Sequence, residues 1–385
     1  MTERVYLDWN ATAPVRPEAR AAVLAAIDVL GNPSSVHAEG RAARRLIEEA
    51  RENVAALVGA EPRNVTFTSG GTEANMLALA PDYGAATHSN LMVSAIEHPS
   101  VLAGGRFHPL AVEQSPVAGS GQIDLAALER RLAALPRGVL VSVMLANNET
   151  GVVQPISDVA ALVRQARGTL HVDAVQGPGR ITCDINVLGA DLLTLSGHKI
   201  GAPKGVGALI RRDGAKPFPA ALITGGGQER RARAGTENVA GIAGFGAATA
   251  ASLRNCQSES RCLLALRERL ECSLKAHSPG MVVFGADVER LPNTTLFAVP
   301  GMKAETAVIA FDLEGIAVSS GAACSSGKVQ ASHVLAAMGV SPALARGAVR
   351  VSFGWGTTES DTDAFIRAWI KLSGTLLKEQ KAIAA

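Results

Sequence analysis

Short apolar segments and amphipathic segments alternate through the first two thirds of the chain, and this alternation constrains its fold most strongly. Patterns typical of buried strands occupy residues 64–68, 91–96, 139–145, 169–172, 192–195 and 206–210. Helical patterns lie between most of them, at residues 42–58, 124–135 and 156–167, with Asp124 as the expected N-cap of the second. Strands connected through helices form a mostly parallel sheet that helices cover on both faces. The predicted class is α/β.

The last third of the chain has a different pattern. A long helix is expected over residues 238–277, and strand patterns follow at residues 281–284 and 294–299, before further helices and strands. This order is typical of a smaller α+β domain, and 385 residues suffice for two domains. We expect residues 15–254 to form the large domain, and residues 1–14 and 255–385 to form the small one.

Charge and composition exclude several classes of protein. Acidic and basic residues almost balance, with a formal net charge of +2, and no basic block points to nucleic acid. No apolar stretch approaches the roughly 20 residues of a membrane helix, and the charged N-terminus lacks an apolar signal core. Five cysteines without a C-x-x-C pair do not suggest a disulfide framework or a structural zinc site. We therefore expect a cytoplasmic protein.

A lysine follows directly after one of the buried strands. Residues 191–207 read DLLTLSGHKIGAPKGVG, which places Ser196, His198 and Lys199 at the carboxyl end of a strand, where open α/β sheets bind ligands. Partial desolvation among apolar residues and glycines would leave the Lys199 amine uncharged and able to form a Schiff base. An ordinary loop lysine fits this local sequence equally well.

Two other strand ends carry polar residues. The segment HVDAVQ, at residues 171–176, ends a strand with Asp173, a buried acid that could pair with a protonated pyridine nitrogen. The segment TSGGTEAN, at residues 68–75, joins a strand to a helix through two glycines, and such a turn attracts phosphate. Taken alone, the first segment also fits an N-cap or a salt bridge, and the second fits an ordinary βα turn.

One cysteine has unusual neighbours. The segment SSGAACSSGK, at residues 319–328, surrounds Cys324 with small and polar residues just after an apolar strand. This composition predicts an exposed, flexible loop with a reactive thiol. Cys183, Cys256, Cys262 and Cys272 lie in or beside helix and strand patterns, and we expect them to be structural.

Together these segments resemble the cysteine desulfurases of the nitrogen-fixation and iron–sulfur-cluster type, which are fold type I (aspartate-aminotransferase-like) pyridoxal 5'-phosphate enzymes. The resemblance runs nearly end to end. It includes YLDWNATAP at residues 6–14, GNPSSVH at 31–37, EHPSV at 97–101, NNETGVVQPI at 147–156, RAGTEN at 233–238 and VRVSFG at 349–354. Some of these segments are weak signals singly, but together and in this order they are specific.

The resemblance implies a role for each matching residue. Lys199 would form the Schiff base with the cofactor, Asp173 would pair with its pyridine nitrogen, and Cys324 would be the nucleophile. His98 would stack on the ring and belongs with Lys199 and Cys324 to the implied catalytic set. The other implied contacts are Gln176 with the phenolic oxygen; Gly71, Thr72, Ser196, His198 and, from a second subunit, Thr236 with the phosphate; and Asn32, Asn148 and Arg350 with the substrate carboxylate.

The same resemblance implies an activity and partners. Sulfur would be removed from L-cysteine, alanine would leave, and a persulfide would remain on Cys324. A homodimer is implied, together with a protein that accepts the sulfur, and an iron–sulfur scaffold, a tRNA-thiolation relay and a nitrogenase assembly protein all stay open. No metal is expected on the enzyme itself, although Cys324 could contact a transferred iron–sulfur cluster.

The chain departs from the commoner family pattern in places. The cysteine loop reads GAAC where GSAC is frequent, and IGAPKG, at residues 200–205, lacks the tyrosine often found there. Neither change removes an assigned chemical group, so we expect activity to survive. The end LLKEQKAIAA is shorter than the tail of the housekeeping members, so their scaffold contact is not implied.

Three alternatives remain. A lyase acting on selenocysteine or cysteine sulfinate would usually carry a shorter cysteine segment, and selenide release stays open as a side activity. An aminotransferase of the same fold would keep Lys199 and Asp173 without needing a reactive cysteine. A non-catalytic sulfur carrier or regulatory partner would have lost at least one of Lys199, Asp173, Arg350 and Cys324, and all four are present.

Overall fold

The computed structural model describes residues 4–83, 88–135, 138–214, 218, 220–321, 324–325, 328–329 and 331–376. For residues 324, 325, 328, 329, 375 and 376 it describes the backbone alone. None of the helices in this described part is long and apolar enough to span a membrane.

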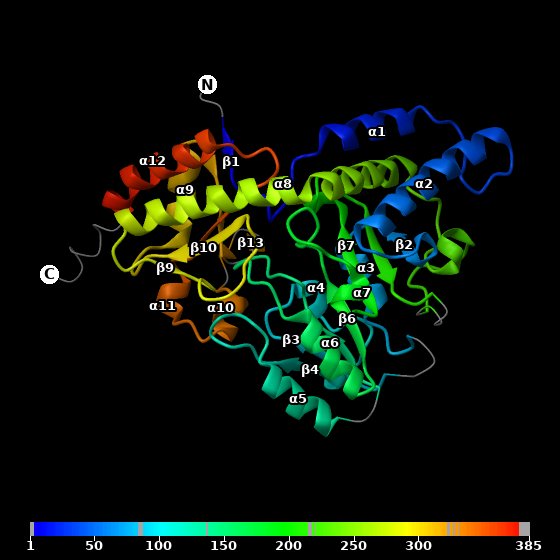
Figure 1. Cartoon of the computed structure of the whole chain (residues 1–385), viewed down its shortest axis with the longest axis horizontal. Coiled ribbons are helices and arrows are strands. Elements are labelled where there is room, and N and C mark those ends of the chain that lie inside the picture. The colour runs from blue at the N-terminus through cyan, green and yellow to red at the C-terminus, as the bar shows by residue number, and fades with distance from the viewer. Residues whose placement is uncertain are drawn as a thin grey trace.

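A seven-stranded sheet forms the centre of the larger part of the molecule (Figure 1). From one edge to the other its strands are β2 (Val65–Thr68), β8 (Gly207–Arg211), β7 (Leu192–Ser196), β6 (Thr169–Asp173), β5 (Leu140–Ser142), β3 (Leu91–Ser94) and β4 (Val112–Ser115). All pairs from β7 to β4 are parallel, which confirms the predicted class. Strand β8 is antiparallel to both neighbours, because the short connection from β7 leaves no room for a crossover helix.

Helices cover this sheet, as the sequence predicted. They are α1 (Pro17–Ile27), α2 (Ala38–Leu57), α3 (Gly71–Ala78), α4 (Pro99–Leu102), α5 (Leu125–Ala134), α6 (Ile156–Gln165) and α7 (Ile185–Leu188). Helix α2 begins before the predicted residue 42, because the His37 side chain caps it by accepting a hydrogen bond from the Gly40 N–H. The expected cap of α5 is confirmed, since the Asp124 side chain accepts from the Ala127 N–H.

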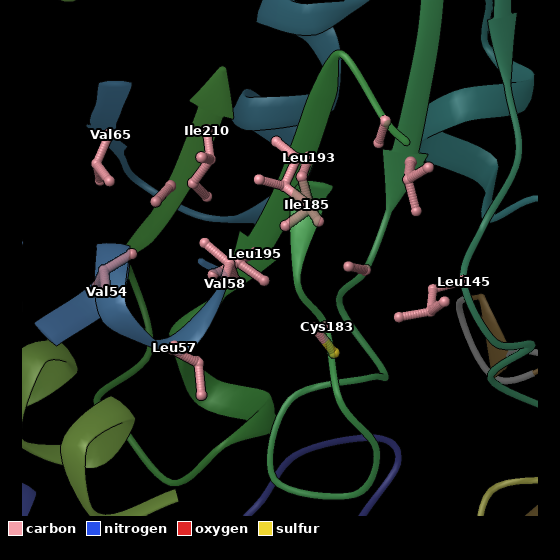
Figure 2. Packing of buried hydrophobic residues seen from close by; sticks show 14 of the residues in the cluster. Val54, Leu57, Val58, Val65, Leu145, Cys183, Ile185, Leu193, Leu195 and Ile210 are labelled. Atoms are coloured by element: carbon pink, nitrogen blue, oxygen red, sulfur yellow. The ribbon is translucent and has the colours of Figure 1, made fainter. Parts of the chain in front are cut away.

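An apolar layer joins the sheet to its helices. Figure 2 shows Val54, Leu57 and Val58, at the end of α2, in one buried cluster with residues of β7 and β8. Leu193 and Leu195 of β7 are almost completely buried there. Because each such side chain contributes about 1.5–3 kcal/mol when buried, this layer holds α2 against the sheet.

A four-stranded sheet organises the smaller part. Its order is β12 (Ser319–Ser320), β15 (Val349–Ser352), β10 (Thr294–Ala298) and β9 (Val282–Val283), with all pairs antiparallel. Close to it, β1 (Val5–Tyr6) pairs with β11 (Ile316–Ala317), and β13 (Cys324–Ser325) pairs with β14 (Lys328–Val329). The helices of this part are α9 (Ala304–Leu313), α10 (His333–Ala337), α11 (Pro342–Ala345) and α12 (Glu359–Leu376).

One long helix connects the two parts. Helix α8 (Val239–His277) confirms the helix expected over residues 238–277, and the Asn238 side chain caps it by accepting from the Gly241 N–H. Figure 1 shows α8 crossing the molecule, and its contacts run from α1 and α2 to α12 and β10. The division of the chain at residues 14 and 254 remains a prediction.

Candidate active site

A cavity of about 830 Å3 lies between the two sheets. The carboxyl ends of β6 and β7 and the start of α3 form one side, and β12 and β15 contribute the other. Ten predicted residues line it: Gly71, Thr72, His98, Asn148, Asp173, Gln176, Ser196, His198, Lys199 and Arg350. Residues from six separate segments of the sequence therefore meet at one place.

Lys199 enters the cavity from a single 3-10 turn directly after β7. Its Nζ atom donates to the backbone oxygens of Asn10, at 2.6 Å, and Ala11, at 2.9 Å. Burial, followed by the positive charges of Arg350 and Arg180, lowers the pKa of Lys199 to about 7. A large fraction of this amine is therefore uncharged at neutral pH, as a nucleophilic lysine requires.

Asp173 occupies the last position of β6, where it is 6% exposed. Its Oδ1 atom accepts from the Val175 N–H at 3.0 Å, and its Oδ2 atom accepts from Asn75 Nδ2 at 2.8 Å. Asn75 also donates to Ser100 Oγ at 2.9 Å. These donors hold the carboxylate in one orientation.

The turn before α3 leaves space for an anion. Gly70 has φ of 159°, and a Cβ atom on Gly71 would lie 3.1 Å from Val175 Cγ2 and 3.3 Å from Ser196 Cβ. A side chain at residue 71 would therefore fill the narrow space that opens onto the first N–H groups of α3. His198 lines the same cavity with a pKa lowered to about 4, mainly by burial and then by Lys199, so its imidazole is neutral at pH 7.

One carboxyl group and one backbone carbonyl bind Arg350 on β15. Its Nη2 atom forms an ion pair with Asp8 Oδ1 at 2.7 Å, and Nη1 donates to the Asn148 oxygen at 2.9 Å. Its Nε atom is buried without a hydrogen-bond partner in the described part of the chain. Asp8 was not predicted, since no local signal marks a residue that contacts its partner across 342 positions.

His98 and Gln176 also line the cavity. His98 Nδ1 lies 2.8 Å from Ser100 Oγ, and burial lowers the pKa of the His98 imidazole although its side chain is exposed to the cavity. Gln176 is 4% exposed, and its Nε2 atom donates to the Asn10 oxygen at 3.0 Å.

Two buried acids were missed by sequence reasoning. Glu149 lines the cavity, accepts from Ser332 Oγ at 2.6 Å, and has its pKa raised by burial to about 7. Glu97 is fully buried behind the cavity and accepts from the Met144 N–H at 2.6 Å. Burial, then the charge of Asp173, raises the pKa of Glu97 well above its usual range. Glu149 directly follows Asn148, and Glu97 directly precedes His98. This adjacency to predicted site residues was the one sequence signal that could have pointed to the two acids.

Three predicted residues are not brought to the cavity by the described contacts. Asn32 is exposed, and its Oδ1 atom accepts from the Ser34 N–H, while Thr236 is exposed beyond the end of β8. The backbone of Cys324 lies in β13, and its side chain is outside the described residues. The roles of all three stay predictions.

The other cysteines do not share one environment. Cys183 is buried, where desolvation raises the pKa of its thiol, and Cys256 is half-buried. Cys262 and Cys272 are exposed on α8, so packing does not explain them, contrary to the expectation that all four are structural. In the same described residues, no three His, Cys, Asp or Glu side chains gather closely enough to hold a metal ion.

Comparison with known proteins identifies the family. The class V aminotransferase family matches residues 5–365. A cysteine desulfurase of Cereibacter sphaeroides is 43% identical over 371 residues, which covers 94% of each chain. The chain belongs to the cysteine desulfurases. An IscS-like cysteine desulfurase of Mycobacterium tuberculosis is 37% identical over 99% of this chain and 98% of its own.

Solved structures agree with this assignment. A NifS-like protein of Rickettsia africae superposes with a TM-score of 0.88 at 37% identity, over 97% of this chain and all of that one. A protein named SspA, solved in complex with cysteine, superposes with a TM-score of 0.76 at 30% identity, over 92% of this chain and all of that one. The fold is therefore that of the NifS-like, fold type I enzymes, and the family depends on pyridoxal phosphate.

The residues of the cavity fit this cofactor. The narrow space at Gly71 suits a phosphate group, and the amine of Lys199 is prepared for an aldehyde by its lowered pKa. Asp173 supplies a fixed carboxylate for a pyridinium nitrogen. Asn75, which holds that carboxylate and lines the cavity, keeps its own Oδ1 atom buried without a partner in the described residues.

Proposed function

We propose that the enzyme removes sulfur from L-cysteine and stores it as a persulfide on Cys324. One observation carries the proposal: Lys199, Asp173 and Arg350 meet around one cavity. Strand β12, which ends four residues before Cys324, lines the same cavity. An extended chain spans at most about 3.6 Å per residue, so Cys324 starts within roughly 15 Å of this cavity wall.

Different side chains of the cavity bind the substrate, the cofactor phosphate and the cofactor ring. Arg350 and Asn148 bind the substrate carboxylate, for which the planar guanidinium offers a bidentate contact. Gly71, Thr72, Ser196 and His198 hold the cofactor phosphate, joined by Thr236 of a second subunit. Gln176 donates to the phenolic oxygen of the cofactor, and His98 stacks on its ring.

Proton and sulfur transfer follow from these positions. Pyridoxal phosphate, when bound, withdraws electrons from the substrate and stabilises negative charge there, with Asp173 keeping its ring nitrogen protonated. Lys199, whose lowered pKa leaves a large fraction of its amine uncharged at neutral pH, takes the proton from the substrate Cα atom. The Cys324 thiolate then attacks the substrate sulfur, a sulfur–sulfur bond forms, and the carbon–sulfur bond breaks with its electron pair left on carbon. Protonation of that carbon gives alanine.

A homodimer and a sulfur-acceptor protein complete the proposal. Thr236 and Asn32 are exposed in the single chain, which suits contacts made across a subunit interface. An iron–sulfur scaffold or another sulfur-acceptor protein would receive the sulfur, and Cys324 would contact a transferred iron–sulfur cluster.

The test uses the purified enzyme with pyridoxal phosphate, L-cysteine and a thiol reductant. Wild type and Cys262→Ala, a variant of an exposed cysteine on α8, are expected to form alanine and sulfide equally. Cys324→Ala is expected to retain the visible cofactor band and to form neither product. Equal activity of Cys324→Ala would instead favour a lyase for selenocysteine or cysteine sulfinate, and amination of 2-oxo acids would favour an aminotransferase.

A further inference from the structure

The amide of Gln176 is held at both of its ends. Its Oε1 atom accepts from Arg180 Nη1 at 2.7 Å, and its Nε2 atom donates to the Asn10 oxygen at 3.0 Å. Arg180 Nη1 also donates to the Gln176 backbone oxygen at 2.8 Å. Gln176 and Arg180 are 4% and 6% exposed, so water does not compete for these hydrogen bonds.

These partners determine which end of the amide faces the cavity. A guanidinium group can only donate and a backbone oxygen can only accept, so the reversed amide would place donor against donor and acceptor against acceptor. These hydrogen-bond partners therefore fix the orientation of the Gln176 amide. Asn10 lines the cavity and Arg180 does not, so the NH2 end lies on the cavity side. One of its two hydrogens remains for a ligand.

Arg180 is an unusual partner for a neutral amide. Within the described residues it forms no ion pair with a carboxylate, and burial lowers the pKa of its guanidinium to about 10. A buried charge without a countercharge is costly, so a residue that served packing alone would not need to be arginine.

The same contacts lead to the catalytic lysine. The Asn10 oxygen that accepts from Gln176 also accepts from Lys199 Nζ, at 2.6 Å. Arg180, Gln176, Asn10 and Lys199 thus form one hydrogen-bonded chain. The positive charge of Arg180 is also one of the causes that lower the pKa of Lys199.

We propose that Arg180 is a positioning residue that locks the Gln176 amide with its N–H toward the cofactor, so that the site favours the deprotonated phenolic oxygen. This inference rests on the proposed function, which places that oxygen beside Gln176. An N–H donor stabilises a phenolate and an amide oxygen repels it, so release of the lock raises the pH at which the phenolic oxygen loses its proton.

The experiment is a pH titration of the visible absorption of the cofactor-loaded enzyme. In Arg180→Met the midpoint is expected to rise by about one pH unit or more, the change that the loss of one charge-supported hydrogen bond produces. Arg180→Lys, which keeps a donor-only cation, is expected to restore most of the wild-type midpoint. Arg290→Met removes a buried arginine of the smaller part, paired with Glu271, and is expected to leave the midpoint unchanged.

Arg180→Gln provides a second route if the methionine variant does not fold. Its amide can accept as well as donate, so Gln176 is free to reverse, and the midpoint is again expected to rise. If Arg180→Met and Arg180→Gln both titrate with the wild-type midpoint, the proposed positioning role of Arg180 is wrong, and the proposed function still stands. The same conclusion follows if only one of the two variants folds and it has the wild-type midpoint. If the wild type itself forms no visible band with pyridoxal phosphate, the proposed function fails and this inference fails with it.

Discussion

Replacing Arg51 by methionine would break a buried ion pair at the edge of the large sheet. Arg51 Nη1 and Nη2 each lie 2.8 Å from a carboxylate oxygen of Glu229, and both side chains are 2% exposed. The pair also contacts the open edge of β2, because Arg51 Nη1 donates to the Val65 oxygen and Glu229 Oε2 accepts from the Phe67 N–H. It thereby replaces the neighbouring strand that β2 lacks on this side.

The cost can be worked out from these contacts. Arg51→Met removes two charge-assisted hydrogen bonds from Glu229, each contributing about 1.5–3 kcal/mol, and leaves a buried carboxylate with one backbone donor. Broken buried pairs cost about 3–5 kcal/mol, and we expect a loss of that size in the free energy of unfolding. Glu229, Arg230 and Arg231 also have positive φ of 45°, 56° and 69°, and the ion pair restrains this unfavourable backbone.

The assay is urea denaturation of the cofactor-free protein followed by circular dichroism. The double variant Arg51→Met/Glu229→Gln is expected to be more stable than Arg51→Met, because it leaves no unpaired charge. Arg45→Met, in an exposed pair with Glu49, is expected to cost less than about 1 kcal/mol. A loss below about 1 kcal/mol in Arg51→Met, or a double variant less stable than the single one, would refute the reasoning.

Three further predictions concern the cavity. Burial raises the pKa of Glu149 to about 7 from the usual 4.5, so the folded protein resists ionisation of this acid. As the pH rises from about 4.5 to about 7, the wild type is therefore expected to lose about 3 kcal/mol of unfolding free energy relative to Glu149→Gln. An equal pH dependence of the unfolding free energy in the two proteins would contradict this prediction. Lys199 in the cofactor-free enzyme is expected to react with cyanate half-maximally near pH 7, as followed by peptide mass spectrometry, and a midpoint near the ordinary lysine value of about 10.4 would refute its lowered pKa. Gly71→Ala is expected to weaken pyridoxal phosphate binding about tenfold or more in a fluorescence titration, with little loss of stability, because the new Cβ enters the space beside Ser196. The control is Gly374→Ala in α12, where a Cβ meets nothing within 4 Å, and this variant should leave binding unchanged.

Local sequence was sufficient where the physical cause is itself local. The extent of helix α8 and the cap of α5 at Asp124 could be predicted, since a cap depends on a side chain and an N–H three residues later. Lys199 and Asp173 could be placed at strand ends, because apolar segments predict buried strands and parallel strands end at one edge of the sheet. The antiparallel direction of β8 could not be predicted, since it depends on how the short connection from β7 packs.

The sequence by itself therefore determined the class of fold, the family, and the residues able to carry lysine, carboxylate and thiol chemistry. Only the tertiary structure decided how those residues are charged and held. Asp8 pairs with Arg350 across 342 positions, and Glu149 meets Ser332 across 183. The shared Asn10 oxygen joins Gln176 to Lys199. Burial shifts the pKa of Lys199 and of Glu149 toward neutrality, and burial is a property of the surrounding packing that no short segment encodes.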